Sequence, residues 1–276
     1  MLTKNVDLYL KDFESVFGHV DPAFVRNSGP AIYDSIFLTH NIGYEYEIER
    51  DNDGYNTMHY CVASLIANHK YKPKEEKVIT RHYYYSSENA EQEIEATNRW
   101  ERSVRIFLQV LNHGISINAP RINKSCIDES PLMYAIEKHA PLDVLKLLIK
   151  YGAYMDQDLV SGTSVLSICY YADYIEAAKL LLDLGADPNV IDDGFYNPLA
   201  YVFDEYDEET PDFNKMDKFI HLFLAYGSLP DHVDGFEDYI KDPDGYFKKQ
   251  TWLTDEVLEH KKKTFKLLEK YYKGKR

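Results

Sequence analysis

The residue types that most often do chemistry are present in this chain, but they do not stand at catalytic or metal-binding spacing. The 276 residues include ten histidines and three cysteines. No His-Glu-x-x-His, Cys-x-x-Cys or Gly-x-Ser-x-Gly motif occurs, so the usual zinc and hydrolase signatures are absent from the sequence. We therefore expect no catalytic residue, no metal ion and no cofactor, and a chain that is not an enzyme.

Two acidic stretches resemble parts of a calcium-binding loop, Asp51 to Gly54 and Asp242 to Gly245. In the first stretch, Tyr60 stands where the closing bidentate glutamate should fall when Glu49 is the opening ligand. Turn formation explains both stretches better, because Asp, Asn, Gly and Pro are the residues that turns prefer.

Acidic residues are concentrated in one part of the sequence. Between Asp128 and Asp212 there are four lysines, no arginine and eighteen acidic residues, a net charge of −14 against −15 for the whole chain. From Lys241 to Arg276 there are eleven basic and six acidic residues, a net charge of +5. An acidic surface attracts basic proteins and repels nucleic-acid phosphates. The alternative is a solvated face that only keeps the protein soluble.

The elements that carry these residues recur along the chain. Gly152 and Gly185 lie 33 residues apart, and each follows a leucine-rich segment that reads as the end of a helix. A shorter apolar segment precedes each, and its first residue is a Ser or Asn that can cap a helix. The pattern predicts helix pairs closed by a left-handed glycine. The expected core leucines are Leu132, Leu148, Leu166, Leu181 and Leu199.

These motifs resemble the ankyrin repeat. The segments that begin at Ser130, Ser164 and Asn197 are similar to its Thr-Pro-Leu-His-x-Ala start, and Asn56 to Cys61 is a further copy. The resemblance implies an all-α ankyrin-repeat solenoid of about five to six stacked helix-turn-helix units, with hairpin loops and divergent terminal caps. We expect a protein that is a monomer on its own.

The repeats suggest three regions. We expect a degenerate N-terminal capping repeat over 1–43, and a C-terminal capping repeat with a basic helix over 233–276. The ankyrin repeats fill 44–232, with an insertion at 68–98 and an acidic insertion at 204–215. The last insertion is interpreted as a flexible acidic loop between two helices, the second of which begins at Met216.

Apolar residues at helical spacing continue from Ser87 to Asn112. They predict one long helix that places Trp100 near the rest of the fold. The preceding tyrosine run, His82 to Tyr85, lies near several lysines, a mixture that can bind nucleobases or pack against its own scaffold. We favour packing, and nucleic acid is a disfavoured partner.

Histidine and cysteine in the first helices are interpreted as structural residues. His59 occupies the histidine position of the ankyrin motif, which implies a hydrogen bond to loop backbone. Met133, Ser167 and Ala200 occupy that position in the later units. Cys61 and Cys169 occupy a small-residue position and are expected to be buried reduced thiols.

The resemblance also implies where a partner would bind. The residue before the small core position tends to face the concave groove, and tyrosine suits a binding surface because it offers large contact area with few rotatable bonds. The groove positions would be Tyr60, Tyr134, Ile168 and Tyr201, flanked by Glu137, Asp204 and Glu205. The hairpin positions, along one edge, would be Tyr154, Asp156, Asp158, Asp187, Asp192 and Asp193.

The sequence therefore predicts a non-enzymatic protein–protein interaction module that binds a basic segment through its groove and hairpin tips. The alternative is an effector or enzyme in which the array is a targeting scaffold and the insertion or C-terminal segment carries an activity. No apolar run approaches the ~20 residues of a membrane helix, and Met1 to Phe17 do not resemble a secretory signal. We expect a cytoplasmic protein. Divergent, Tyr-, Asn- and Lys-rich ankyrin proteins resemble those of intracellular bacteria and large viruses, which implies delivery into a host cytosol.

Overall fold

The computed structural model describes residues 54–72, 88–112, 115–123, 126–156, 164–192, 194–207 and 210–274. The chain divides into two compact units, and the boundary lies between Ala153 and Tyr154. Unit 1 ends at Ala153, and unit 2 begins at Tyr154. The capping repeat expected over 1–43 lies outside the described residues, as do Asp51 to Asp53 and the tyrosine run His82 to Tyr85.

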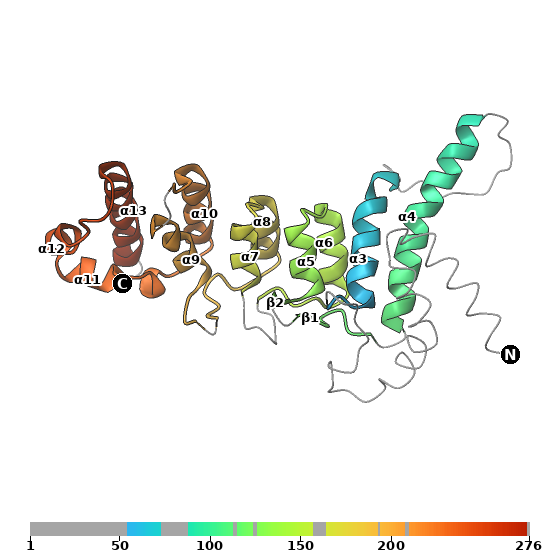
Figure 1. The fold of residues 1–276 in the computed structure, drawn as a ribbon, viewed down its shortest axis with the longest axis horizontal. Helices are drawn as coiled ribbons and strands as arrows, with labels where there is room; N and C mark the ends of the chain where they lie inside the picture. Colours follow the sequence, from blue (N-terminus) through green and yellow to red (C-terminus); the bar gives the residue numbers. More distant parts are fainter. Residues whose placement is uncertain are drawn as a thin grey trace. The chain divides into compact units, whose positions relative to one another are not determined.

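The described part of unit 1 contains helix pairs and one short hairpin (Figure 1). Helix α3 packs against the long helix α4 and against α5, and α5 packs on α6. The two strands pair in antiparallel fashion, with Arg121 opposite Glu129. The elements are α3 (Thr57–Asn68), a 3₁₀ turn η2 (His69–Tyr71), α4 (Glu88–Asn112), β1 (Arg121–Asn123), β2 (Cys126–Glu129), α5 (Pro131–Glu137) and α6 (Leu142–Lys150).

Unit 2 repeats the same pairing. Its first helices pack on one another, α7 on α9, and its second helices do the same, α8 on α10. Each pair therefore buries its apolar face against the next pair, as a helical repeat requires. The elements are α7 (Val165–Tyr171), α8 (Ile175–Asp183), α9 (Pro198–Asp204), η3 (Glu205–Asp207), α10 (Phe213–Ala225), η4 (Pro230–His232), α11 (Phe236–Lys241), α12 (Pro243–Lys248) and α13 (Asp255–Gly274).

The predicted core and helix ends are confirmed. All five expected leucines are at most 1% exposed. Gly152, Gly185 and Gly227 have φ values of 96°, 100° and 94°, in the left-handed region that residues with a Cβ seldom adopt. The repeat register read from the glycines is therefore the register of the fold.

The first helices begin where capping residues were expected, with one exception. The Asn56 side chain accepts a hydrogen bond from the backbone N–H of Met58, and Ser130 and Asn197 cap α5 and α9 in the same way. Ser164 is fully buried before α7, but its side chain accepts no capping hydrogen bond. The structure offers no reason for this difference.

The long helix predicted up to Asn112 is present as α4, which starts at Glu88. Trp100 lies near the rest of unit 1, as expected, because its ring packs edge-on against His69 with centroids 5.5 Å apart. Residues 88–98, assigned to an insertion, are thus part of the second helix of this repeat.

Two boundaries differ from the sequence expectation. Helix α10 begins at Phe213, three residues before Met216, because the Asp212 side chain accepts from the Lys215 N–H and caps the helix there. The stretch from Asp242 to Gly245 opens helix α12 and is not a simple turn. Asp242 accepts from the Gly245 N–H at 3.0 Å, so the residue types of a turn here form a helix cap.

Candidate protein-binding surfaces

In unit 1, His59 has the structural role that was expected of it. Its Nε2 donates to the carbonyl oxygen of Glu129 at 3.0 Å, which ties α3 to the end of β2. The side chain is 1% exposed, so it offers no surface to a substrate. Cys61 and Cys169 are also confirmed as buried free thiols, and burial raises the pKa of both.

Tyr134, the clearest groove candidate in unit 1, lies in an aromatic cluster whose rings already have cations over them. Its ring packs edge-on against Tyr55 at 5.6 Å and against His59 at 5.7 Å. The Lys138 ammonium lies 5.5 Å from the Tyr134 ring centre, and the Arg121 guanidinium lies 4.1 Å from that of Tyr55. The protein's own basic residues thus occupy part of this surface.

Two acidic side chains flank the cluster. Glu129 is 7% exposed and lies 3.6 Å from Arg121. Burial and the nearby carboxylate of Glu137 raise the pKa of Glu129 to about 8, so it carries a proton at neutral pH. Glu137 is exposed, and Tyr60, the other groove candidate of unit 1, is half-buried.

In unit 2, Tyr201 belongs to a group of three tyrosines. Its ring centroid lies 5.7 Å from that of Tyr171 and 5.6 Å from that of Tyr196. Tyr171 is 58% exposed and Tyr196 is 36% exposed. Ile168, the expected groove residue of α7, is only 8% exposed and offers little contact area. Sequence reasoning missed Tyr171, the last residue of α7, and Tyr196, which precedes the cap of α9.

The hairpin turn before α9 is held by Asp192. The Asp192 carboxylate accepts hydrogen bonds from the N–H groups of Gly194 and Tyr196, both at 2.9 Å. Asp192 is 8% exposed, which corrects the expectation that it projects as a binding residue. An aspartate that can satisfy local N–H groups folds back on its own turn. The residue that projects is Phe195, 78% exposed with φ of 66°.

Glu205 is also an internal residue. The Tyr170 hydroxyl donates to its carboxylate, the Asp212 N–H donates at 3.1 Å, and Lys215 lies 3.4 Å away. Burial would raise the pKa of Glu205, but these partners outweigh it and lower the pKa. The expected flexible acidic loop is therefore ordered at Glu205, and among the groove-flanking residues of unit 2 only Asp204 is exposed.

Three of the hairpin candidates lie on the surface. Tyr154, Asp156 and Asp187 are exposed, and the Asp156 carboxylate accepts from the Asp187 N–H at 2.7 Å. Asp158 and Asp193 lie outside the described residues.

A polar network in the last helices was not expected from the sequence. The Tyr206 hydroxyl lies 2.8 Å from His260 Nδ1, and His260 Nε2 lies 3.3 Å from Asp217. This order of groups can relay a proton, but Tyr206 is 1% exposed and cannot meet a substrate. Its hydroxyl also donates to Thr264, so the network joins η3, α10 and α13.

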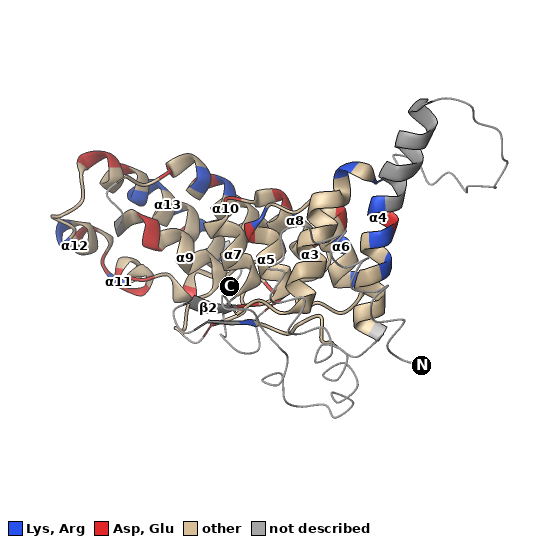
Figure 2. Cartoon of the chain, turned by 45° about the vertical axis from the view of Figure 1, so that its right-hand side comes forward, with Lys and Arg blue, Asp and Glu red and all other residues tan. Residues whose placement is uncertain are grey.

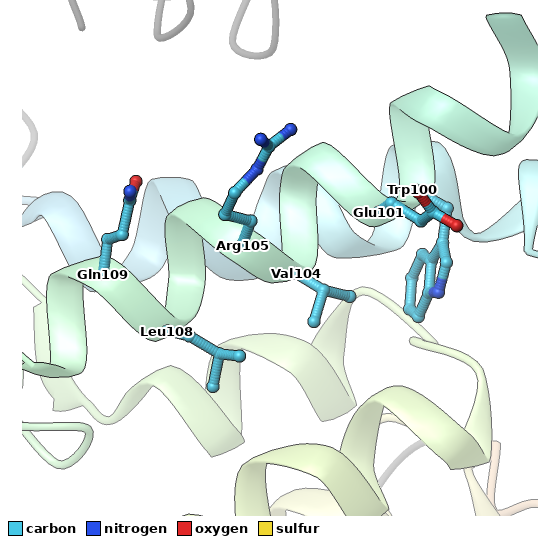
Figure 3. A pocket seen from close by; sticks show the side chains of 6 residues that line it. All are labelled: Trp100, Glu101, Val104, Arg105, Leu108 and Gln109. Atoms are coloured by element: carbon cyan, nitrogen blue, oxygen red, sulfur yellow. The ribbon is translucent and has the colours of Figure 1, made fainter.

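Helix α4 presents a different kind of surface. Trp100, Val104 and Leu108 are half-buried and point from one side of the helix, whereas Arg105 and Gln109 point from the other (Figure 3). Their spacing of four residues makes an apolar stripe. Lys and Arg positions gather along the same helix (Figure 2). Helix α4 thus has an apolar side and a side that carries Arg105.

Two further properties concern only the part of the chain that the structure describes. No three His, Cys, Asp or Glu side chains there come together as potential metal ligands. None of the helices described is both long enough and apolar enough to cross a membrane.

Comparison with known proteins identifies the repeat. The family model described as ankyrin repeats, in three copies, matches residues 97–192. An ankyrin repeat protein of Fowlpox virus (strain NVSL) is 35% identical over 98 residues, which are 35% of this chain and 15% of that protein. The matched region is therefore a small part of that relative's length.

Two ankyrin repeat domains of known structure match this chain at low TM-scores. An ankyrin repeat domain from Acinetobacter baumannii AYE is 14% identical with a TM-score of 0.45, over 90% of this chain and 98% of that chain. The ankyrin repeat domain of Bcl-3, a member of the IkappaB family, is 14% identical with a TM-score of 0.36, over 75% of this chain and 84% of that one.

Proposed function

Since residues 97–192 of this chain are ankyrin repeats, we propose that it is a non-enzymatic module that binds a basic segment of a partner protein. Ankyrin repeats are generally protein–protein interaction modules. The observation that carries the proposal is the exposed tyrosine group of unit 2, which lies within the acidic part of the sequence.

The charge of this region supports a basic partner. From residue 154 to residue 212 there are fourteen acidic residues and a single basic one, Lys179, which is paired with Asp183 at 2.6 Å. Such a surface accelerates encounter with a positively charged protein, and salt screens the attraction over ~8 Å at physiological ionic strength.

Aromatic side chains on this surface would supply apolar contact area to a partner, which charged side chains do not provide. Tyrosine and phenylalanine at a protein surface are typical of the desolvated centre of an interface. Tyr171 and Phe195 are both more than half exposed, and the same part of unit 2 holds Asp204 at the end of α9.

Affinity capture with the full chain, followed by binding kinetics with the purified partner, tests the proposal. We expect the association rate to fall as salt rises. Asp187→Lys should slow association, whereas Tyr201→Ala should mainly speed dissociation. Asp192 is unsuitable for charge reversal, because its carboxylate holds the turn.

The matched control is Glu176→Lys, an equal charge change at an exposed position in the first turn of α8. If Asp187→Lys and Glu176→Lys slow association equally, net charge alone accounts for it, and the hairpin surface is not the contact. A partner whose association rate does not depend on salt would contradict a basic segment.

The alternative, a scaffold that carries a separate activity, has no observation in its favour among the described residues. One chain of groups resembles catalytic machinery, Tyr206 with His260 and Asp217, and its tyrosine is closed to solvent. We propose a reducing compartment, and the free thiols of Cys61 and Cys169 support it.

A further inference from the structure

We propose that Tyr171, Tyr196 and Tyr201 form a site for one arginine side chain of the partner, with Asp204 as the adjacent carboxylate. This inference rests on the proposed function and names the group that the basic segment inserts. The three rings lie within one group, since Tyr201 contacts both of the others at 5.6 to 5.7 Å. All four residues belong to unit 2.

Unit 1 contains a filled version of this arrangement. Tyr55 precedes Asn56, the cap of α3, as Tyr196 precedes Asn197, the cap of α9. Over Tyr55 lies the Arg121 guanidinium, at 4.1 Å from the ring centre and 3.6 Å from the carboxyl group of Glu129. An arginine between a tyrosine face and an acidic side chain is therefore a contact that this protein itself makes.

The described residues of unit 2 supply no such cation to the tyrosine group. Within the described part of unit 2, no Lys or Arg lies over Tyr171, Tyr196 or Tyr201, although Lys215 lies 4.1 Å from the ring centre of the neighbouring Tyr170. The single basic residue between 154 and 212 is Lys179, which is paired with Asp183. We therefore expect the cation to come from the partner.

Carboxylates are placed to complete the site. Asp204 follows Tyr201 by three residues on α9, so the two side chains lie on neighbouring positions of one helix face. Burial, Asp204 and Asp192 together raise the pKa of Tyr171 to about 12, which agrees with a negative potential at that ring. A cation over the ring would be attracted by both the ring face and the carboxylates.

The site is held in place before a partner arrives. Asp192 fixes the turn that leads into Tyr196 with two hydrogen bonds. The same turn holds Phe195 in the left-handed region, a strained conformation for a residue with a Cβ, and exposes 78% of it. Strain that presents an apolar ring to solvent is expected where the ring has a binding role, and Phe195 can cover the aliphatic part of the arginine.

Arginine fits this chemistry better than lysine. The guanidinium group is planar, is weakly hydrated and can stack on an aromatic ring while it donates to a carboxylate. An ammonium group is a strongly hydrated point charge, so more of its hydration is lost at a ring face. We therefore expect selectivity for arginine and not only for positive charge.

Fluorescence anisotropy with the full chain tests the site. The probe is a labelled short peptide of alternating arginine and glycine, compared with the same peptide containing lysine or the neutral isostere citrulline. We expect the arginine peptide to bind at least about five-fold more tightly than the lysine peptide. The citrulline peptide should not bind, since it lacks the charge.

The variants are chosen to separate binding from folding. Tyr171→Ala and Tyr196→Ala should each weaken binding of the arginine peptide at least about five-fold, and Tyr171→Phe should retain it, because the ring remains. Asp204→Asn should weaken binding and reduce its salt dependence. Tyr271→Ala is the control, since this tyrosine of α13 is 38% exposed and lies outside the group. Circular dichroism melting curves establish that each variant is folded.

Each other outcome overturns the proposal. Equal binding of the lysine and arginine peptides would leave only a general acidic surface. Binding that Tyr171→Ala and Tyr196→Ala leave unchanged would place the arginine contact elsewhere, and absence of peptide binding would remove the site. In all three cases a captured partner with salt-dependent association would still support the interaction module, so the two proposals fail separately.

Discussion

The side chain of Asn189 bridges to the backbone beside Gly227. Its Nδ2 donates to the carbonyl oxygen of Gly227 at 3.3 Å, and its Oδ1 accepts from the N–H of Leu229 at 2.7 Å. In unit 1, Asn118 donates to the carbonyl oxygen of Gly152 at 3.0 Å. Both asparagines stand four residues after a repeat glycine, so one side chain links consecutive hairpin loops.

Asp156 holds the same position, four residues after Gly152, but a carboxylate can only accept. It takes the N–H of Asp187 at 2.7 Å and has no donor for the carbonyl oxygen of Gly185. Asp156→Asn should supply that donor and raise the free energy of unfolding by about 1 kcal/mol. Urea denaturation measures it. Asp187→Asn is the control, because it changes the charge equally. If it raises the free energy of unfolding by the same amount, the effect is due to charge.

Glu129 should make the stability of unit 1 depend on pH. Its pKa is raised from 4.5 to about 8 in the folded state, so between these values the native state keeps a proton that the unfolded chain releases. The free energy of unfolding should therefore fall as pH rises through this window, by up to about 1.4 kcal/mol per pH unit. Above the folded pKa this contribution to the slope ends.

Denaturation of wild type and Glu129→Gln at pH values between 4.5 and 8 checks this. Glutamine keeps the volume but cannot ionise, so the variant should lose the slope that Glu129 causes. Glu137→Gln should shorten the window, because the carboxylate of Glu137 helps to raise the pKa of Glu129. An unchanged slope in Glu129→Gln would show that other groups control it.

Phe195→Gly should stabilise unit 2. The residue has φ of 66°, which costs a residue with a Cβ roughly 1–2 kcal/mol, and its ring is 78% exposed, so little burial is lost. Glycine also loses more backbone entropy on folding, so we expect the free energy of unfolding to rise by up to about 1 kcal/mol. Phe195→Ala removes the ring and keeps the strain, so thermal unfolding should show that this variant is no more stable than the wild type. A loss in the glycine variant would mean that the ring is structural.

Leu166 tests the repeat register. It is fully buried in α7, and truncation to alanine should lower the free energy of unfolding by ~2–5 kcal/mol. Leu184, in the loop after α8, is 46% exposed, and Leu184→Ala should change stability by less than about 0.5 kcal/mol. If Leu166→Ala and Leu184→Ala lower the free energy of unfolding equally, the core positions are misassigned.

The repeat architecture could be predicted from the sequence because each of its signals is local. Helix caps, apolar spacing and left-handed glycines act within a few residues, so Ser130, Leu148 and Gly185 identify their own places in the fold. Repetition then strengthens a weak signal, since the same residue types recur at the same offsets. His59 could be assigned a hydrogen bond to loop backbone for the same reason.

Which side chains are available to a partner was decided only by the tertiary structure. Asp192 and Glu205 are acidic, as residues that bind a basic partner would be. The Asp192 carboxylate, however, accepts hydrogen bonds from backbone N–H groups of its own turn. The Glu205 carboxylate accepts a hydrogen bond from Tyr170 and pairs with Lys215. Tyr171 and Tyr196 lie 25 residues apart in the sequence and meet only through Tyr201. A carboxylate or a ring takes whichever partner the folded chain brings nearest, and residue type alone does not specify that partner.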